Sequence, residues 1–316
     1  MQKFNVLFQM DPFDKLNKGI DSTCKLVHEA LLRGHKVFTS QPGDIYFSIN
    51  TVSVTCSNVL FTNNQSLKTK KKKRTINLED FDVVFVRQDP PFNMDYISNT
   101  YIHDLINLKK APFYINNPNG IRNFTEKLFP LLFTEIIPET AIMNNEHDIL
   151  RFIRNYESVV IKPLYDRGGN GVDLVKKNDP NKLEKIKVLT KNFQERIVIQ
   201  EFIKNVSKGD KRVLLVDGNP VGAINRVPQK SEFKANLHLG ARAKKTLLSK
   251  SEKKICEKLK PYLIKNGLFF VGIDIIDEKL TEINVTSPTG IHHLNLLNKK
   301  RIESTMWDII QSKVTN

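Results

Sequence analysis

The sequence predicts an α/β fold of two or three interlocked subdomains, and its first third predicts a doubly wound parallel sheet. Strand and helix patterns alternate through that third, which is typical of open α/β sheets. A chain of 316 residues with 40% hydrophobic content can bury a large core, but it is short for three independent domains. No apolar run approaches the roughly 20 residues that cross a bilayer, so we expect no membrane partner.

The elements of the first domain, residues 1–122, are expected from apolar runs bounded by caps and glycines. In chain order they are a strand at 4–8, a helix at 21–32 that ends at Gly34, strands at 35–39 and 81–86, a helix at 96–108 and a strand at 113–116. Before the third strand, residues 45–61 favour short hairpins. The basic run Lys68–Arg74 that follows them is interpreted as a solvated, mobile loop.

The pattern changes after residue 122, and we divide the rest of the chain into residues 123–203 and 204–316. The expected elements are helices at 124–133 and 147–155, strands at 138–142, 159–164, 197–202 and 212–216, a helix at 251–265, strands at 269–276 and 280–285, and a terminal helix. A long polar segment at residues 228–245 lacks periodicity. Because long loops inside compact domains are usually functional or disordered, we expect a mobile lid there.

The net charge of +15 raises the question of a nucleic-acid partner. Most of the excess is lysine spread along the chain, and the dense run Lys68–Arg74 has no interleaved aromatic residues for base stacking. We therefore expect no nucleic-acid partner. The cysteines Cys24, Cys56 and Cys256 are odd in number without paired spacing, and residues 1–5 begin no apolar signal core, so a reducing cytoplasm is the expected location.

The first candidate site is a glycine-rich turn that follows the strand carrying Lys162. Gly168, Gly169 and Gly171 allow backbone amides to approach phosphate oxygens, and Lys162 supplies a positive charge for the same anion. The lysine precedes the glycines here, whereas it follows them in a P-loop, so the pattern favours a hairpin lid that closes over a nucleotide. A plain structural hairpin has the same glycine pattern.

The second candidate site is a set of oxygen donors on two strands near the end of the chain. Alternation along a strand places Glu282 and Asn284 on one face, and the intervening hairpin brings Asp274 opposite them. Two carboxylates and an amide suit Mg²⁺, which completes its shell with phosphates and water. The alternative is an ordinary acidic surface, but the apolar neighbours of Asp274 and Glu282 make stray carboxylates costly there.

The third candidate group is a set of arginines in a lysine-rich chain: Arg87, Arg212, Arg226 and Arg242. Arginine makes planar, two-pronged contacts with carboxylates and phosphates that lysine cannot make. Each arginine taken alone is more often a surface residue than a ligand, although a predicted hairpin can direct Arg212 and Arg226 the same way. The histidines are interpreted as structural or surface residues, since the adjacent His292 and His293 splay around a helix.

Six motifs occur in order along the chain. They are Asp89-Pro90-Pro91-Phe92, Glu126-Lys127-Leu128-Phe129, Lys162-Pro163-Leu164 with its glycines, Gly209-Asp210-Lys211-Arg212-Val213, Gly272-Ile273-Asp274, and Thr281-Glu282-Ile283-Asn284-Val285-Thr286-Ser287-Pro288-Thr289. With this set the chain resembles the bacterial glutathione synthetase family from Met10 to the terminal helix. It departs from the family pattern at Asp166-Arg167 in the glycine turn, at Lys234 where an arginine is usual, and at His292.

The resemblance implies a three-part ATP-grasp fold and a ligase that joins γ-glutamylcysteine to glycine. In the implied reaction, ATP phosphorylates the cysteinyl carboxylate and the glycine amine then displaces phosphate. The implied cofactors are ATP and Mg²⁺, with Mn²⁺ as a substitute, and the implied assembly is a homotetramer. Such chemistry needs charge neutralisation and alignment more than a dedicated acid or base, in keeping with a chain that offers Lys, Arg and metal ligands.

The resemblance also assigns roles to residues by position. It places the nucleotide at Lys127, Lys162, Gly168, Gly169, Glu201, Phe202, Ile203 and Asp210. It places the metal at Asp274, Glu282 and Asn284. It places the peptide substrate at Arg212, Arg226, Asn236, Arg242, Asn284 and Ser287, of which the three arginines are the expected catalytic groups.

Two alternatives stay open. One is another ATP-grasp carboxylate–amine ligase with a different acceptor, because acceptor choice depends on a few loop residues. The other is a basic nucleic-acid-binding protein with a vestigial ligase frame. The intact set of Lys127, Lys162, Asp274, Glu282 and Asn284 favours an enzyme over the second alternative.

Overall fold

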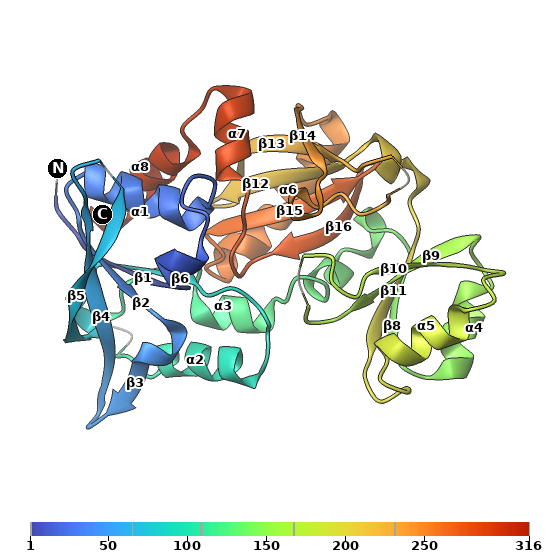
Figure 1. Ribbon diagram of the computed structural model, residues 1–316, viewed down its shortest axis with the longest axis horizontal. Helices are drawn as coiled ribbons and strands as arrows, with labels where there is room; N and C mark the ends of the chain where they lie inside the picture. The colour runs from blue at the N-terminus through green and yellow to red at the C-terminus, as the bar shows by residue number, and fades with distance from the viewer. Residues whose placement is uncertain (1, 65, 108–109, 167, 231, 316) are drawn as a thin grey trace.

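The computed structural model describes residues 2–64, 66–107, 110–166, 168–230 and 232–315. In these residues the strands form three sheets, which follow each other along the long axis of the molecule (Figure 1). The mixed α/β architecture confirms the predicted fold class. Among the described residues, no helix is long and apolar enough to span a membrane.

The first sheet has a parallel centre with helices on both faces. Its parallel strands, in spatial order, are β2 (Lys36–Ser40), β1 (Asn5–Met10), β6 (Val83–Arg87) and β7 (Phe113–Ile115). One face packs on α1 (Ser22–Leu32) and the other on α2 (Met94–Asp104) and α3 (Pro118–Asn123). Burial on both faces explains why β1 is a continuous apolar run, and it confirms the predicted doubly wound sheet.

Antiparallel strands extend this sheet beyond β2. They are β3 (Ile45–Ser48), β4 (Thr51–Phe61) and β5 (Leu67–Asn77). The predicted loop at Lys68–Arg74 is therefore wrong, because the run lies within β5 and pairs with β4. Leu67 and Ile76 turn toward the core at its ends, while the lysines between them are exposed. Lysine on an exposed strand edge discourages pairing with another sheet, so a charged run is compatible with a strand.

The second sheet is small and antiparallel. Its strands, in spatial order, are β10 (Asp173–Lys176), β9 (Ser158–Pro163), β11 (Ile197–Glu201) and β8 (Thr140–Met143). Alternating apolar residues of β9 and β11 pack against α4 (Glu146–Ile153) and α5 (Lys182–Leu189). The opposite face of the sheet carries Lys162 and turns toward the third sheet.

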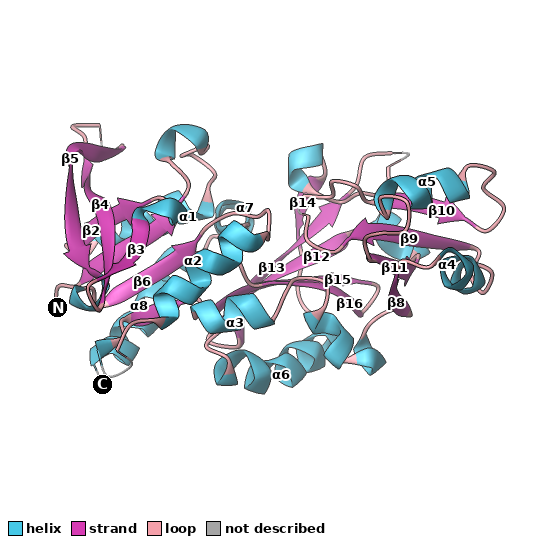
Figure 2. Ribbon diagram, turned by 90° about the horizontal axis from the view of Figure 1, so that it is seen from below, coloured by secondary structure: helices cyan, strands magenta, loops and turns pink. Residues whose placement is uncertain are grey.

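The third sheet provides the other wall of the site. Its strands, in spatial order, are β14 (Arg242–Lys245), β13 (Asn219–Val227), β12 (Asp210–Val216), β15 (Phe270–Ile276) and β16 (Lys279–Asn284). The amphipathic helix α6 (Lys250–Lys265) covers one face (Figure 2), and α7 (Ile291–Asn298) packs on the other. β14 begins inside the segment predicted as a loop, so the irregular part of that segment ends at Ala241.

The predicted helix at residues 124–133 is wrong. The carbonyl of Glu126 accepts a hydrogen bond from the N–H of Ile283, which ties this segment to β16. Only a short 3-10 turn, Phe129–Leu132, follows, and Pro130 at its start lacks a backbone donor. Phe129 and Phe133 are buried against α6, so tertiary packing stabilises an irregular conformation despite the helical spacing of apolar residues.

The last helix, α8 (Ile302–Thr315), returns to the first sheet and packs on α1. Trp307 is fully buried there, and its indole N–H donates to the carbonyl of Leu26 at 3.0 Å. Arg33 at the end of α1 donates to Gln311 at 2.6 Å and forms an ion pair with Asp308 at 2.8 Å. The two ends of the chain consequently lie near each other beside the first sheet (Figure 1).

Candidate active site

A cavity of about 830 Å³ opens between the second and third sheets and reaches the first domain. Its lining combines Lys15 and Asp89 of the first domain with Lys162 of β9 and the polar face of the third sheet. The lining contains every residue to which the resemblance assigns a role except Arg242, which is exposed at the start of β14. Of the glycines in the candidate turn, Gly168 and Gly169 line the cavity and Gly171 does not. Arg87 also lies elsewhere, buried between Thr23 and the carbonyl of Pro288.

Strand register places a charged ladder on one face of the third sheet. Asp210 of β12 lies opposite Arg226 of β13, and Arg212 lies opposite Asp274 of β15, which in turn lies opposite Glu282 of β16. Because side chains alternate along a strand, these groups share the face that lines the cavity. The apolar residues between them pack under α6.

Two arginines bind the carboxylate at the centre of this ladder. Arg212 donates to both oxygens of Asp274, at 2.5 Å and 2.9 Å, and Nη2 of Arg226 lies 3.0 Å from Oδ1 of the same residue. Burial by itself would raise the pKa of Asp274, but the two guanidinium groups outweigh burial and hold that pKa well below its usual range. Asp274 is thus a fixed negative charge between two fixed positive charges.

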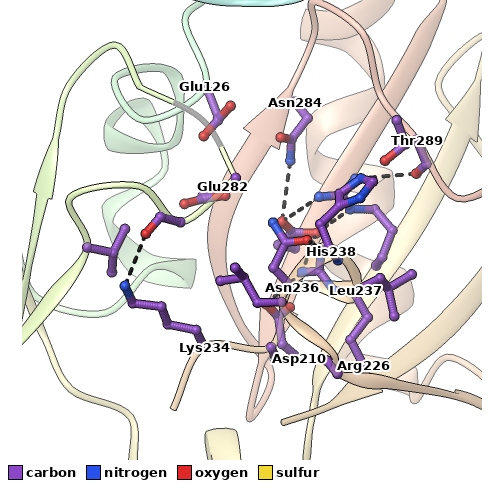
Figure 3. A pocket seen from close by; sticks show the side chains of 18 of the residues that line it. Glu126, Asp210, Arg226, Lys234, Asn236, Leu237, His238, Glu282, Asn284 and Thr289 are labelled. Atoms are coloured by element: carbon purple, nitrogen blue, oxygen red, sulfur yellow. Dashed lines mark hydrogen bonds and ion pairs between the residues drawn. The ribbon is translucent and has the colours of Figure 1, made fainter. Parts of the chain in front are cut away.

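Asp210 has a different environment (Figure 3). Its Oδ2 accepts from Arg226 at 2.6 Å, yet burial raises the pKa of Asp210 to about 6 against the opposing effect of that arginine. Within the described part of the chain, buried Oδ1 of Asp210 and Nε of Arg226 have no hydrogen-bond partner. A buried oxygen and a buried N–H beside a cavity suit a ligand that both donates and accepts hydrogen bonds.

Lys162 connects the two sheets across the cavity. Its ammonium lies 3.1 Å from Oε1 of Gln200 on the neighbouring strand β11 and 3.6 Å from Oε1 of Glu282 on the third sheet. The residue is only 9% exposed, so its charge acts in a poorly solvated place. A buried cation at this position is suited to an anionic ligand that enters between the sheets.

A second lysine, Lys127, lies on the irregular segment beside β16. Its ammonium binds Oε1 of Glu126 at 2.8 Å and donates to the carbonyl of Asp166 at 2.6 Å. Burial raises the pKa of Glu126, and the negative charge of the nearby Glu282 raises it further. Burial opposes the charge of Lys127, but Glu126 and Glu282 outweigh it and raise the lysine pKa. Lys127 therefore stays charged beside the glycine turn.

The predicted metal ligands lie together on the paired strands β15 and β16, at one end of the charged ladder. Nδ2 of Asn284 lies 3.4 Å from Oδ2 of Asp274, so its amide oxygen is not used in that contact. Glu282 faces Asp274 across the strands and repels Glu126, and a cation would relieve this crowding of carboxylates. In the part of the chain that the structure describes, no group of three His, Cys, Asp or Glu forms a metal site. This sparse donor set fits Mg²⁺, which takes one or two carboxylates and fills its shell with phosphates and water.

The glycine turn and the long loop meet above the cavity. Gly168, Gly169 and Gly171 have positive φ angles of 69°, 81° and 66°, which a residue with a side chain would adopt only with strain. The ammonium of Lys234 on the loop donates to the carbonyl of Gly169 at 3.2 Å. Arg167 of the turn and Ser231 of the loop lie outside the described residues. The predicted lid thus contacts the turn that follows Lys162.

The loop also contacts the end of β11. The ring of Phe233 meets the ring of Phe202 edge to face, with centroids 6.2 Å apart. Phe202 and its neighbours Glu201 and Ile203 line the cavity and connect the second sheet to the third. The N–H of Glu201 donates to the carbonyl of Glu139, so this connection is fixed to the start of the neighbouring strand β8.

Several residues of the cavity were missed as site residues by sequence reasoning. They are Lys15, Glu126, Gln200, His238 and His293. Glu126 adjoins a predicted lysine, but neither its burial nor its nearness to Glu282 is visible in the sequence. His238 and His293 were interpreted as structural or surface residues, and only the packing of the loop on α7 brings them to the cavity.

Solved structures of the same fold include the D-cycloserine synthetase DcsG and the ATP-grasp ligase PsnB. DcsG has a TM-score of 0.67 at 12% identity and covers 98% of this chain and 99% of its own. PsnB, complexed with a phosphomimetic precursor variant, Mg and ADP, has a TM-score of 0.63 at 12% identity and covers 100% of both chains. At such low identities the likeness concerns the fold, which is that of ATP-grasp ligases.

Sequence relatives are far more similar. The glutathione synthetase of Rhodopseudomonas palustris is 39% identical over 98% of both chains, and that of Mesorhizobium japonicum is 36% identical over 98% of this chain and 99% of its own. The glutathione synthetase of Gloeobacter violaceus is 34% identical over 96% and 95%.

Family comparison covers both halves of the chain. Residues 4–122 match the N-terminal domain of prokaryotic glutathione synthetase, and residues 126–299 match the ATP-grasp domain of the same enzyme. Since these matches span nearly the whole chain and the relatives align over nearly its full length, the chain belongs to the prokaryotic glutathione synthetase family.

Proposed function

We propose that this chain joins γ-glutamylcysteine to glycine with the use of ATP, releasing glutathione, ADP and phosphate. Family membership supports the reaction, and the cavity between the second and third sheets supports its location. The observation that carries the proposal is the convergence of Lys162, Arg212, Arg226 and Glu282 on one cavity from two sheets. A transfer of phosphate to a carboxylate needs such a concentration of positive charge beside a metal ligand.

The nucleotide is proposed to lie under the glycine turn. Lys127 and Lys162 neutralise its phosphates, and the amides around Gly168 and Gly169 approach them from above. Oδ1 of Asp210, which has no partner among the described residues, accepts a hydrogen bond from a ribose hydroxyl, and the segment Glu201–Ile203 holds the base through its backbone. The fold neighbour PsnB, whose complex contains ADP and Mg, supports a nucleotide in this class of cavity.

The divalent cation is assigned to Glu282 and Asn284, with Asp274 beside them. The carboxylate of Asp274 has about four lone-pair directions. The two arginines use three of them and the amide nitrogen of Asn284 approaches the fourth at 3.4 Å, so Asp274 binds the cation when Asn284 turns its amide oxygen to the same cation. When bound, Mg²⁺ supplies positive charge that neutralises phosphate oxygens during transfer. Mn²⁺ has similar ligand preferences and is proposed as a substitute.

The chain's own residues then align and protect the peptide substrate. Arg212 and Arg226 line the cavity and are assigned to stabilise the negative charge on the phosphorylated carboxylate. Asn236, Asn284 and Ser287 line the same space and are assigned to the peptide. Arg242 is assigned to the peptide as well, and it reaches the cavity only after a movement of the loop. The loop excludes water from the reactive acyl phosphate.

The division of the chain, its assembly and its location are part of the same proposal. The segments 1–122, 123–203 and 204–316 act as three parts, of which the second closes on the third. The assembly is a homotetramer located in the cytoplasm, as the sequence resemblance implies.

A coupled assay tests the proposed reaction. Purified enzyme with ATP, Mg²⁺, γ-glutamylcysteine and glycine should release phosphate and glutathione in equal amounts, while omission of either substrate should stop the release. A panel of other amino acids in place of glycine separates this function from that of a ligase with a different acceptor. Faster turnover with another acceptor would replace the proposed substrate but keep the ligase assignment.

A further inference from the structure

The ammonium of Lys162 is held by a chain of hydrogen bonds that runs across the second sheet, of which the first is buried and the next two are half-buried. Oε1 of Gln200 lies 3.1 Å from Nζ of Lys162, and Nε2 of Gln200 lies 2.9 Å from Oγ1 of Thr140. The hydroxyl of Thr140 lies 2.8 Å from the backbone carbonyl of Pro138. Gln200 is 7% exposed, so its amide groups depend on these partners.

The sheet register explains why these side chains meet. Gln200 of β11 lies directly opposite Thr140 of β8, and two residues earlier Val198 lies opposite Lys162 of β9. Because alternate residues share a face, Thr140, Gln200 and Lys162 lie in a row on the face that lines the cavity. The other face carries the apolar residues packed on α4 and α5.

The chemistry of the groups fixes the direction of every hydrogen bond. An ammonium group only donates, so the amide oxygen of Gln200 must face Lys162. Its amide nitrogen must then donate to Thr140, whose hydroxyl accepts with its lone pair and gives its own hydrogen to the carbonyl of Pro138. A backbone carbonyl only accepts, so the chain has a single consistent polarity that starts at Lys162 and ends at Pro138.

A neutral partner suits the lysine better than a charged one would. Glu282 forms an ion pair with the same ammonium from the opposite sheet at 3.6 Å, and a closer approach would strengthen a pairing that an anionic ligand must displace. The amide oxygen of Gln200 provides a competing hydrogen bond that fixes the position of the ammonium without neutralising it. Thr140 in turn prevents the amide from rotating its N–H groups toward the lysine.

We propose that Gln200 and Thr140 are positioning residues, which hold Lys162 with its charge intact at the place where it meets the nucleotide phosphates. The inference rests on the proposed role of Lys162 in ATP binding. Gln200 lies one hydrogen bond from the ammonium and Thr140 lies two, so any effect of these residues on ATP binding must pass through Lys162.

The decisive comparison is Thr140→Val against Thr140→Ser. Valine keeps the shape but can neither accept from Gln200 nor donate to Pro138, so KM for ATP should rise about two- to tenfold, the worth of one neutral hydrogen bond. Serine restores both functions and should return KM for ATP toward the wild-type value, while KM for glycine stays unchanged in both variants. Thr190→Val is the matched control. It removes a buried hydroxyl of the same domain, which donates to the carbonyl of Ile186 at 2.7 Å and has no contact with Lys162.

Gln200→Glu provides a second, nearly isosteric test that does not depend on the folding of the valine variant. It places a carboxylate against the ammonium, so KM for ATP should rise more than in Thr140→Val. Lys162→Ala tests the role of the lysine in ATP binding separately from the positioning role of Gln200 and Thr140. If Lys162→Ala leaves KM for ATP unchanged, the proposed role of the lysine is wrong. If Lys162→Ala raises it while Thr140→Val and Gln200→Glu behave like Thr190→Val, the positioning role is overturned and the lysine role stands.

Discussion

The guanidinium group of Arg212 binds Asp274 through both carboxylate oxygens, with Nε 2.5 Å from Oδ1 and Nη2 2.9 Å from Oδ2. Both side chains are buried and belong to adjacent strands of the sheet that lines the cavity. Removing one partner of such a pair leaves the other charge buried and poorly compensated. The resulting loss of stability is larger than the stabilisation that the intact pair provides.

Arg212→Ala is therefore expected to lower the free energy of unfolding by about 3 kcal/mol, and to abolish ligation. Arg226 still contacts Asp274, so the variant should fold at low temperature. Urea denaturation measures the stability. Lys204→Ala is the control, because its ion pair with Glu157 is exposed on both sides and should not contribute measurably. Equal stability of the two variants would contradict a structural role for the Arg212–Asp274 pair.

Glu282→Gln should keep the side-chain shape but lose magnesium-dependent turnover, since an amide carries no charge to hold a divalent cation. Titration of Mg²⁺ in the coupled assay should show a strongly raised metal requirement. Glu278→Gln alters a carboxylate in the turn between β15 and β16 and should leave that requirement unchanged. A wild-type metal profile in the Glu282 variant would remove this residue from the metal site.

Lys234→Ala should loosen the loop over the cavity, because its ammonium donates to the carbonyl of Gly169. We expect slower ligation and increased phosphate release without product, as water reaches the acyl phosphate, while ATP binding stays nearly intact. The ratio of glutathione to phosphate measures the uncoupling. Deletion of the loop tip should give the same result more strongly, whereas Lys244→Ala on β14 should not change the ratio.

His35 should make stability dependent on pH. Burial, aided by Arg33, lowers the pKa of His35 to about 4, and its Nδ1 accepts a hydrogen bond from the N–H of Phe4. Since the folded state prefers the neutral ring, this stabilisation is complete above the unfolded pKa of 6.5 and is lost as pH falls toward 4.

The measurement is the difference in unfolding free energy between wild type and His35→Asn, which keeps an acceptor but does not titrate. Between pH 6.5 and 4 the wild type should lose stability relative to the variant with a slope of up to about 1.4 kcal/mol per pH unit, the limit for one proton. A flat difference for His35→Asn would show that the ring is not held neutral.

Local signals in the sequence predict the regular parts of the fold well. Asp21 caps α1 through a hydrogen bond to the N–H of Cys24, and Gly34 adopts the positive φ that ends the helix. Apolar runs predict β1 and β6 because both faces of the first sheet are covered. Glu282 and Asn284 could be placed on one face because strand alternation is a rigid rule.

The errors occur where distant contacts override local preference. Lys68–Arg74 forms a strand only because β4 offers hydrogen bonds to its backbone, and composition gives no sign of that partner. Phe124–Phe133 has helical spacing, but its backbone is bound to β16 and its phenylalanines fill the space beside α6. Gln200 and Thr140 are separated by 60 residues, so no local pattern connects them to Lys162.

The position of α8 has a consequence for biosynthesis. The ribosome releases the first sheet and α1 long before Trp307 and the rest of α8, which cover their apolar surface. Until that helix is synthesised, the nascent first domain exposes an apolar surface that chaperones and other chains can bind. A proteolytic cut or premature stop before residue 302 therefore harms the part of the protein that was made first, although every strand of the charged ladder, the last of which ends at residue 284, is still present.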